Sequence, residues 1–391
     1  MKTRRMPTGL VHRPGYNRLM RQPLGVVGIV SPWNYPGLLS LAPAIAALAA
    51  GNRVMIKPSE IGPRFSELLR DAVAKSFSAD EMVVVTGDAE LGRAFVALPF
   101  HHLLFTGSTA VGRQVALAAA ANLTPVTLEL GGKSPCIIDA SCTDLNGAAL
   151  KIAMGKLLNA GQTCIAPDYL LLPRGREAAF ADAYQKAVTR LYPRVVGNPD
   201  YASIVNARQH ARLQGLVDEA RALGARVDDV GPPAMDTPGS AAEARQMRPL
   251  LVFDLPPQAR LLQQEIFGPI LPVLPYDRLD TVIAHINAHP RPLALYWFGD
   301  DAAARDRVLA GTVSGGVTVN DTLMHIAHDG LPFGGVGESG LGAYHGETGF
   351  LRFTHEKAVF VQSRWARGQM LYPPYGPRFD RVIGLIRRLL R

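Results

Sequence analysis

Residues 24–57 read LGVVGIVSPWNYPGLLSLAPAIAALAAGNRVMIK, and this stretch decides the fold. Its first seven residues, 24–30, form a short β-rich apolar run that predicts a buried strand. Residues 38–51 form a longer apolar run that ends at a glycine, which predicts a helix. Residues 53–57 predict a second strand. A strand, a helix and a strand in this order are typical of a parallel sheet with helices on its faces.

The alternation of strands and helices continues to about residue 345, in two successive units. In the first unit, further helices are predicted at 64–77, 88–96 and 109–121, and further strands at 82–87, 102–107 and 125–130. The second unit begins after Gly132, with strands at 134–140 and 169–173 and helices at 143–159 and 175–191. A loop rich in Gly, Pro and Ala at 228–245 is expected to be exposed. Parallel sheets of this kind bind ligands at the carboxyl ends of their strands.

The net charge of +8 is concentrated at the two ends of the chain. Residues 1–21 carry six basic residues and no acidic one, and residues 364–391 carry seven arginines against one aspartate. The residues between these ends therefore carry a net charge of −4. A basic surface for nucleic acid is not needed to explain the charge, and we expect no nucleic-acid partner.

The cysteines and the hydropathy favour a cytoplasmic protein. The three cysteines, Cys136, Cys142 and Cys164, form no C-x-x-C motif, which argues against a disulfide framework and against a metal site. The longest apolar run, 38–50, is too short to span a bilayer. The basic start of the chain is followed by polar residues, where a signal peptide needs an apolar core.

Polar motifs follow the predicted strands of the first unit. Residues 32–36 (PWNYP) follow the first strand, 57–60 (KPSE) the second, 107–112 (GSTAVG) a third and 129–133 (ELGGK) the last. We expect all four at the ligand edge of one sheet. The glycine loop is not the G-x-G-x-x-G fingerprint, but it opens a helix whose free N–H groups could hold a pyrophosphate.

Cys164 has an unusual setting for a packing cysteine. It lies in NAGQTCIAP, residues 159–167, among small and polar residues that leave room for a ligand to approach the sulfur. The residues alone leave a functional and a structural thiol about equally open. Cys136 and Cys142 are interpreted as structural thiols.

Taken together, the motifs resemble those of the aldehyde dehydrogenase superfamily, over essentially the whole chain. Within it, the segment RPLALYWFG and the residues around Cys164 look most like the class 3 branch and its bacterial coniferyl aldehyde dehydrogenases. The motifs that carry the resemblance are PLGVVGIVSPWNYP (23–36), FTGSTAVG (105–112), TLELGGKSP (127–135), NAGQTCIAPDY (159–169), QQEIFGP (263–269) and LPFGGVGESGLGAYHG (331–346).

The resemblance implies three catalytic residues. Cys164 is the expected nucleophile, which attacks the aldehyde to give a thiohemiacetal and then a thioester. Asn34 is expected to stabilise the oxyanion together with the backbone N–H of Cys164. Glu129 is the expected general base for hydrolysis of the thioester. Its apolar neighbours also predict a raised carboxyl pKa.

The resemblance also implies a nicotinamide cofactor and no metal. NAD is the first choice and NADP the second, because Glu60 disfavours a 2′-phosphate while class 3 relatives accept both. The resemblance assigns Lys57 and Glu60 to the adenosine ribose, Gly107, Ser108 and Gly112 to the pyrophosphate, and Glu265 and Phe267 to the nicotinamide ribose.

The expected fold is α/β and aldehyde dehydrogenase-like. Residues 24–131 would form a Rossmann-type dinucleotide-binding domain and residues 132–349 an α/β catalytic domain. Residues 1–23 would form an oligomerisation hairpin, joined by a strand within 350–363, in a homodimer. Residues 364–391 are expected to be a basic amphipathic tail. We favour its packing on its own domain or on a partner subunit over peripheral contact with a membrane.

Family members of this branch carry a helical region before the segment that matches the start of this chain. Either the true start of the protein lies upstream of residue 1, or the chain is shortened by this region. Loss of the region would expose apolar surface on the dinucleotide-binding domain.

The predicted function is NAD(P)-dependent oxidation of apolar or aromatic aldehydes to acids, with coniferyl aldehyde to ferulate as the specific expectation. One alternative is a truncated, inactive or heteromer-forming relative. A less favoured alternative transfers the acyl group to coenzyme A, for which a hydrolytic base at residue 129 would be superfluous.

Overall fold

The computed structural model describes residues 1–233, 245–366 and 368–389. The elements predicted from the sequence in the first unit and at the start of the second are present, and their ends fall within three residues of the prediction. Part of the loop predicted at 228–245 lies outside the described residues. In its first part, Asp229 and Pro233 are exposed as expected, whereas residues 230–232 are buried.

The first unit is a six-stranded sheet with the strand order β15-β7-β6-β3-β4-β5. All neighbours are parallel except β15, which runs antiparallel to β7. Helices α1 and α2 begin with Pro36 and Pro63, whose fixed φ suits the first helical position. The elements are β3 (Val26–Val30), α1 (Pro36–Ala49), β4 (Arg53–Lys57), α2 (Pro63–Ser76), β5 (Met82–Val84), α3 (Ala89–Val96), β6 (His102–Thr106), α4 (Thr109–Ala120), β7 (Val126–Glu129) and β15 (Gly340–Leu341).

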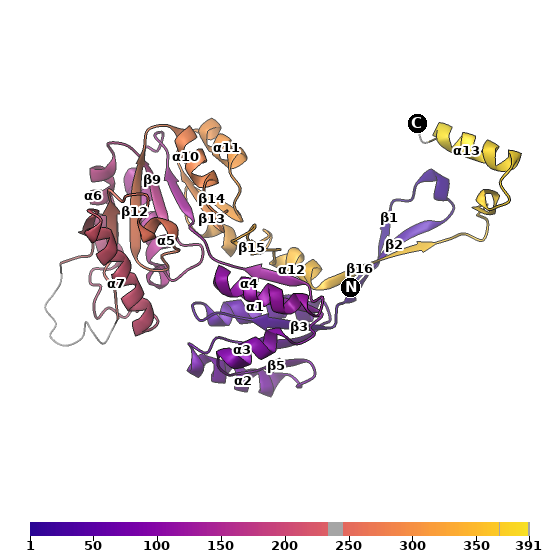
Figure 1. The fold of residues 1–391 in the computed structure, drawn as a ribbon, viewed down its shortest axis with the longest axis horizontal. Coiled ribbons are helices and arrows are strands. Elements are labelled where there is room, and N and C mark those ends of the chain that lie inside the picture. The colour runs from indigo at the N-terminus through magenta and orange to yellow at the C-terminus, as the bar shows by residue number, and fades with distance from the viewer. Residues whose placement is uncertain (234–244, 367, 390–391) are drawn as a thin grey trace.

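The second unit is a seven-stranded sheet with the order β10-β11-β12-β9-β8-β13-β14, in which only β10 is antiparallel to its neighbour. Figure 1 shows it beside the first unit. Its elements are β8 (Pro135–Ile138), α5 (Leu145–Leu157), η2 (Leu158–Gly161), β9 (Tyr169–Pro173), α6 (Glu177–Leu191), α7 (Ala207–Ala222), β10 (Arg226–Asp229), β11 (Leu250–Phe253), α9 (Arg260–Gln263), β12 (Ile270–Tyr276), α10 (Leu279–Asn287), β13 (Ala294–Phe298), α11 (Ala302–Gly311), β14 (Gly316–Val319) and η3 (Met324–Ala327).

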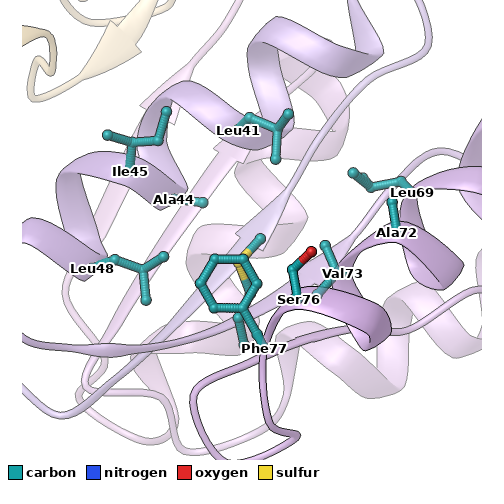
Figure 2. A pocket seen from close by; sticks show the side chains of 10 residues that line it. Leu41, Ala44, Ile45, Leu48, Leu69, Ala72, Val73, Ser76 and Phe77 are labelled. Atoms are coloured by element: carbon teal, nitrogen blue, oxygen red, sulfur yellow. The ribbon is translucent and has the colours of Figure 1, made fainter.

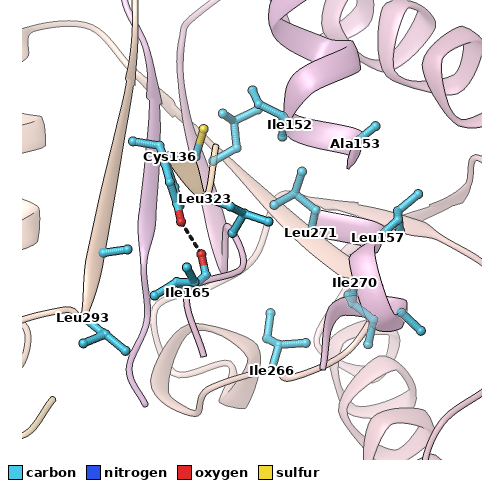
Figure 3. Packing of buried hydrophobic residues seen from close by; sticks show 14 of the residues in the cluster. Cys136, Ile152, Ala153, Leu157, Ile165, Ile266, Ile270, Leu271, Leu293 and Leu323 are labelled. Atoms are coloured by element: carbon cyan, nitrogen blue, oxygen red, sulfur yellow. Dashed lines mark hydrogen bonds between the residues drawn. The ribbon is translucent and has the colours of Figure 1, made fainter. Parts of the chain in front are cut away.

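The core of the second unit contains both cysteines that were interpreted as structural, Cys136 and Cys142. Figure 3 shows Cys136 near Ile152 and Leu323. In the same core, the Tyr296 hydroxyl donates to the Ile165 carbonyl oxygen at 2.5 Å. Burial raises the pKa of the Cys136 thiol well above its usual range. Cys142 is also buried. Buried, protonated thiols of this kind are poor nucleophiles.

A three-stranded antiparallel sheet and a terminal arm lie away from both units (Figure 1). The sheet joins the start of the chain to its last strand, because β2 lies between β1 and β16. The elements are β1 (Arg4–Met6), η1 (Leu10–His12), β2 (Tyr16–Pro23), β16 (Thr354–Val361), η4 (Gly368–Leu371) and α13 (Pro377–Leu389). Helix α12 (Gly346–Arg352), which precedes β16, packs against α1 of the first unit.

Helix α13 lies apart from the two α/β units, next to η4. Its described side chains are half-buried or exposed, and Leu385 is 60% exposed. The prediction that this helix packs on its own domain is therefore wrong for the described residues. Packing on a partner subunit and contact with a membrane stay predictions. Among the described residues, no helix is both long and apolar enough to cross a bilayer.

An apolar groove runs between α1 and α2 on the first unit (Figure 2). Its volume is about 230 Å³, and Leu41, Ile45 and Leu48 of α1 face Leu69 and Phe77 across it. Ile45 is 66% exposed. The sequence predicted exposed apolar surface on this unit, and the groove is such a surface.

Candidate active site

The sheet register brings the polar motifs of the first unit to one edge. Val30, the last residue of β3, pairs with Lys57 on one side and with Phe105 on the other. Thr106 pairs with Glu129 on the next strand. The loops that follow β3, β4, β6 and β7 therefore leave the sheet side by side, as the sequence predicted.

A sharp turn after α5 positions Cys164. The helix was predicted to reach residue 159, but it ends at Leu157 because Asn159 and Ala160 adopt positive φ values of 51° and 53°. Gly161 follows with a φ of 77°, and a Cβ at this position would overlap the carbonyl of Gly268. Glycine is therefore required for the close approach of the two loops. The turn leaves Cys164 half-buried rather than packed in the core.

Two cavities meet at Cys164. One has a volume of about 280 Å³ and is lined from the first sheet edge and from α7. The other has a volume of about 300 Å³ and is lined mainly by apolar side chains. The residues that line both cavities are Leu39, Thr106, Glu129, Leu130 and Cys164. A reaction at this sulfur can therefore use one ligand from each side.

The second cavity suits an apolar molecule. Apart from the shared residues, its lining comes from α1, α5, η3 and the loops around them, and its polar members are few. The members not shared with the first cavity are Tyr35, Leu38, Met154, Leu158, Thr163, Ile165, Asp321, Thr322, Leu323, Met324, Ile326, Ala327 and Phe333. Such a lining binds hydrophobic ligands by burying their apolar surface.

Glu129 is an unpaired, buried carboxyl group at the end of β7. Its side chain is only 3% exposed, and neither carboxylate oxygen has a hydrogen-bond partner among the described residues. Burial raises the pKa of this carboxyl well above its usual range, against a smaller opposite effect of the positive charge of Arg352. A carboxyl group of raised pKa at a cavity is suited to proton transfer.

The thiol of Cys164 is protonated in this arrangement. Burial raises its pKa to about 12, and the negative charges of Glu265 and Glu129 act in the same direction. The backbone N–H groups of Cys164 and Ile165 oppose this, because they favour negative charge on the sulfur. Attack by the sulfur therefore requires a nearby group to take its proton.

Asn34 lies next to the cysteine loop and is fixed to it. Its side-chain N–H donates to the Gln162 carbonyl oxygen at 3.0 Å, and the Asn159 side chain donates to the Asn34 carbonyl oxygen at 3.0 Å. Tyr35 and Thr163 share a hydrogen bond of 2.7 Å beside it. An amide NH₂ group has two protons, so one remains for another acceptor.

The first cavity contains most of the residues predicted to bind a cofactor. Gly107, Ser108, Glu265 and Phe267 line it, together with Trp33. Ser108 caps α4 by accepting a hydrogen bond from the N–H of Val111 at 3.4 Å. The free N–H groups and dipole of this helix start favour an anion in the cavity.

Three residues predicted to bind the cofactor do not line this cavity. Lys57 is buried and donates to Glu60 at 3.2 Å, so the two side chains pair with each other. Gly112 lies one turn inside α4, and a Cβ there would stand 2.6 Å from Leu130 Cδ2. This glycine lets the helix pack closely on the end of β7.

Two residues that the sequence did not single out also line the first cavity. Gln209 and Arg212 face it from α7. Arg212 donates to the Ile266 carbonyl oxygen at 2.5 Å and to the Glu265 carbonyl oxygen at 3.4 Å. Their spacing of three residues places both on one helix face, but no motif marked that face.

Glu265 offers a buried acceptor to a ligand in the first cavity. One of its carboxylate oxygens is buried without a hydrogen-bond partner among the described residues. Burial raises the carboxyl pKa to about 8, and the negative charge of Asp168 contributes in the same direction. The carboxylate lies over Gly131, where a Cβ would overlap it. A free acceptor beside a helix start fits the ribose and pyrophosphate of a dinucleotide.

The fold and this pair of cavities define an NAD(P)-dependent oxidoreductase that acts on aldehydes. The chain belongs to the aldehyde dehydrogenase family, because residues 4–359 match the model of the "Aldehyde dehydrogenase family".

Individual relatives agree with this assignment. The chain is 49% identical over 383 residues to a probable coniferyl aldehyde dehydrogenase of Pseudomonas aeruginosa, covering 98% of this chain and 79% of that protein. It is similar to the structure of Staphylococcus aureus AldH in its substrate-bound state, with a TM-score of 0.91, 38% identity and coverage of 98% and 82%. It is also similar to PnpE in complex with nicotinamide adenine dinucleotide, with a TM-score of 0.83, 26% identity and coverage of 94% and 74%.

Proposed function

We propose that this protein oxidises coniferyl aldehyde, or a closely related aryl-propenal, to the carboxylic acid, with Cys164 as nucleophile and Glu129 as general base. The observation that carries the proposal is the position of Cys164 at the junction of a dinucleotide-type cavity and an apolar cavity, beside an unpaired carboxyl group.

In the first step, the Cys164 sulfur attacks the carbonyl carbon of the aldehyde after losing its proton to Glu129 or to water. The product is a thiohemiacetal with negative charge on the former carbonyl oxygen. The free amide proton of Asn34 and the backbone N–H of Cys164 are the donors proposed for this oxygen. Donors fixed in advance, as Asn34 is by Gln162, stabilise such charge without reorganisation.

In the second step, NAD(P)⁺ supplies the hydride acceptor when it is bound, and Cys164 is left as a thioester of the acid. Glu129, after releasing to solvent any proton that it took from the sulfur, then takes a proton from a water molecule, which attacks the thioester carbon. The carbon–sulfur bond breaks, the acid leaves and Cys164 is regenerated. The raised pKa of Glu129 supports this role, because it increases the proton affinity of the carboxylate.

We further propose that Ser108 and Gly107 face the pyrophosphate and that Glu265 and Phe267 face the nicotinamide ribose. Their position around the first cavity supports these roles. Lys57 and Glu60 are proposed for the adenosine ribose, and the negative charge of Glu60 favours NAD over NADP there. Gly112 is proposed to act by packing rather than by contact, and Gln209 and Arg212 are added as candidates for cofactor contact.

The proposed substrate rests on relatives and on cavity chemistry. Several of the most similar curated relatives are named coniferyl aldehyde dehydrogenases or probable ones. The apolar lining of the second cavity supports an aromatic substrate.

A homodimer in the cytoplasm is also proposed. In its support, the outer edges of β1 and β16 pair with no other strand among the described residues, and free strand edges commonly pair between subunits.

The test is NADH formation by the purified chain with coniferyl aldehyde and NAD, measured beside Cys164→Ala. The expected result is turnover that the substitution abolishes. Ferulate formed without any added thiol separates hydrolysis from acyl transfer to coenzyme A. Turnover that survives in Cys164→Ala would contradict the proposed nucleophile, and turnover of short aliphatic aldehydes alone would contradict the proposed substrate.

A further inference from the structure

A buried ion pair connects the segments that carry the proposed catalytic residues. Lys133 lies four residues after Glu129, and Asp168 lies four residues after Cys164. The Lys133 ammonium donates to one carboxylate oxygen of Asp168, and the two side chains are only 13% and 4% exposed. The loop after β7 and the loop that carries Cys164 are thereby joined.

The same pair also holds the segment that carries Glu265. Lys133 donates to the carbonyl oxygens of Leu261, at 2.7 Å, and Gln264, at 3.0 Å. The second carboxylate oxygen of Asp168 accepts from the N–H of Ile266 at 2.9 Å. The residues immediately before and after Glu265 are thus each bound by one member of the pair.

Stability alone does not explain such a pair. Desolvation of two buried charges offsets much of their mutual attraction, so a buried ion pair is weak evidence for a stabilising role. Here each partner uses its remaining hydrogen-bonding capacity on the backbone next to Glu265. The arrangement fixes where the Glu265 carboxylate lies, and it places two opposite charges close to that carboxylate.

We propose that Lys133 and Asp168 are positioning residues that hold the carboxylate of Glu265 over Gly131 and set its charge, and so control cofactor binding. The inference rests on the proposed contact of Glu265 with the cofactor. It assigns to Lys133 and Asp168 an action through Glu265 rather than on the reacting atoms.

The two members of the pair act on Glu265 with opposite sign. The negative charge of Asp168 raises the pKa of the Glu265 carboxyl, while the positive charges of Lys133 and Arg212 and a hydrogen bond from the Gly132 backbone lower it. Burial is the largest cause of its rise to about 8. The Glu265 carboxylate also interacts electrostatically with Cys164 and Lys156, and Cys164 interacts in the same way with Glu129.

The test is NAD affinity as a function of pH, without aldehyde, in Lys133→Met and Asp168→Asn. An ionised Glu265 accepts hydrogen bonds from ribose hydroxyls better than a neutral one. The NAD affinity of the wild type should therefore increase as pH rises, with a midpoint near the Glu265 pKa. Lys133→Met removes a positive charge and should move the midpoint up by about one pH unit. Asp168→Asn should move it down by a similar amount.

Controls separate positioning from general damage. Asp277→Asn removes one partner of an exposed pair with Arg174 and should leave the midpoint unchanged. Lys133→Arg and Asp168→Glu keep the charges, so they report on the midpoint even if the neutral variants do not fold. Both should keep it within about 0.5 units of the wild type.

Four outcomes are distinguishable. Opposite shifts in the two neutral variants support the proposal. Suppose that the midpoint vanishes in Glu265→Gln. The proposal is then overturned if the midpoint is unchanged in both Lys133→Met and Asp168→Asn, or if it moves in the same direction in both. If Lys133→Met or Asp168→Asn is insoluble, loss of the midpoint in the charge-keeping variants also overturns it. A midpoint that persists in Glu265→Gln instead contradicts the proposed cofactor role of Glu265.

Discussion

The ring of Trp33 meets the ring of Phe267 edge-on, with ring centroids 5.6 Å apart and ring planes at 81°. Trp33 follows β3 of the first sheet, whereas Phe267 precedes β12 of the second, so the pair closes the first cavity from both units. Because one member is a tryptophan, events in this cavity can be followed by fluorescence.

We expect NAD to change the fluorescence of Trp33 and Phe267→Ala to weaken NAD binding about tenfold. An aromatic pair of this geometry contributes about 0.5–1.5 kcal/mol, and tenfold in affinity corresponds to about 1.4 kcal/mol. A fluorescence titration measures both effects. In Trp33→Phe the signal should be lost while Trp297 and Trp365 remain. A full signal in that variant would show that the reporter is another tryptophan.

Gly131→Ala should impair cofactor binding far more than Gly132→Ala. A Cβ at residue 131 would overlap the Glu265 carboxylate, so this side chain must move out of the cavity. A Cβ at residue 132 would have its nearest neighbours at 3.6 Å, which is ordinary contact. We expect NAD affinity to fall at least about tenfold in the first variant and less than about twofold in the second. Equal affinities, measured by calorimetry, would contradict the position of Glu265.

Glu129→Gln should reduce kcat by about 10²–10⁴, because the amide cannot take a proton from water. If base action is needed mainly for hydrolysis, the thioester on Cys164 should accumulate. Rapid mixing followed by mass spectrometry of the intact protein would detect a mass increase equal to the acyl group. A variant with wild-type kcat would exclude Glu129 as the base.

The same substitution should stabilise the protein, and more so at alkaline pH. An unfolded chain ionises Glu129 near its ordinary pKa, whereas the folded protein keeps it protonated up to a raised pKa. Between these two pKa values the folded state binds more protons than the unfolded state, so the stability of the folded protein falls as pH rises. Glutamine does not ionise in either state, so it does not contribute this pH-dependent loss of stability. Glu129→Gln should raise Tm by about 2 °C or more near pH 8 and by less near pH 5. Calorimetric scans at both pH values measure this increase in Tm. A larger increase near pH 5 than near pH 8 would contradict the prediction.

The sequence predicted the strands and the clustering of their loops well, for a physical reason. In a parallel sheet, the ends of all strands lie at the same edge, so the motifs that follow the strands already predict that Lys57, Ser108 and Glu129 share one edge. The sulfur of Cys164 joins them because small residues before it allow a turn. These features depend on local sequence.

Features that depend on contacts between elements far apart in the sequence were not predictable in the same way. Gln209 and Arg212 face the cavity only because α7 packs beside the loop around Glu265. Nothing in the sequence brings Lys133 to the carbonyl of Leu261. Gly112 belonged to a recognisable loop, but whether it faces a ligand or Leu130 depends on how closely α4 approaches the sheet.

The meeting of two cavities at one sulfur also has a kinetic consequence. Under the proposed assignment of the two cavities, the aldehyde and the dinucleotide approach Cys164 from different sides, so neither has to leave before the other can enter. An apolar inhibitor that fills the cavity around Met154 and Phe333 should compete with the aldehyde while leaving the apparent KM for NAD unchanged. The acid can then depart on its own side while the reduced dinucleotide is still in place, so the order of product release is not imposed by the shape of the site.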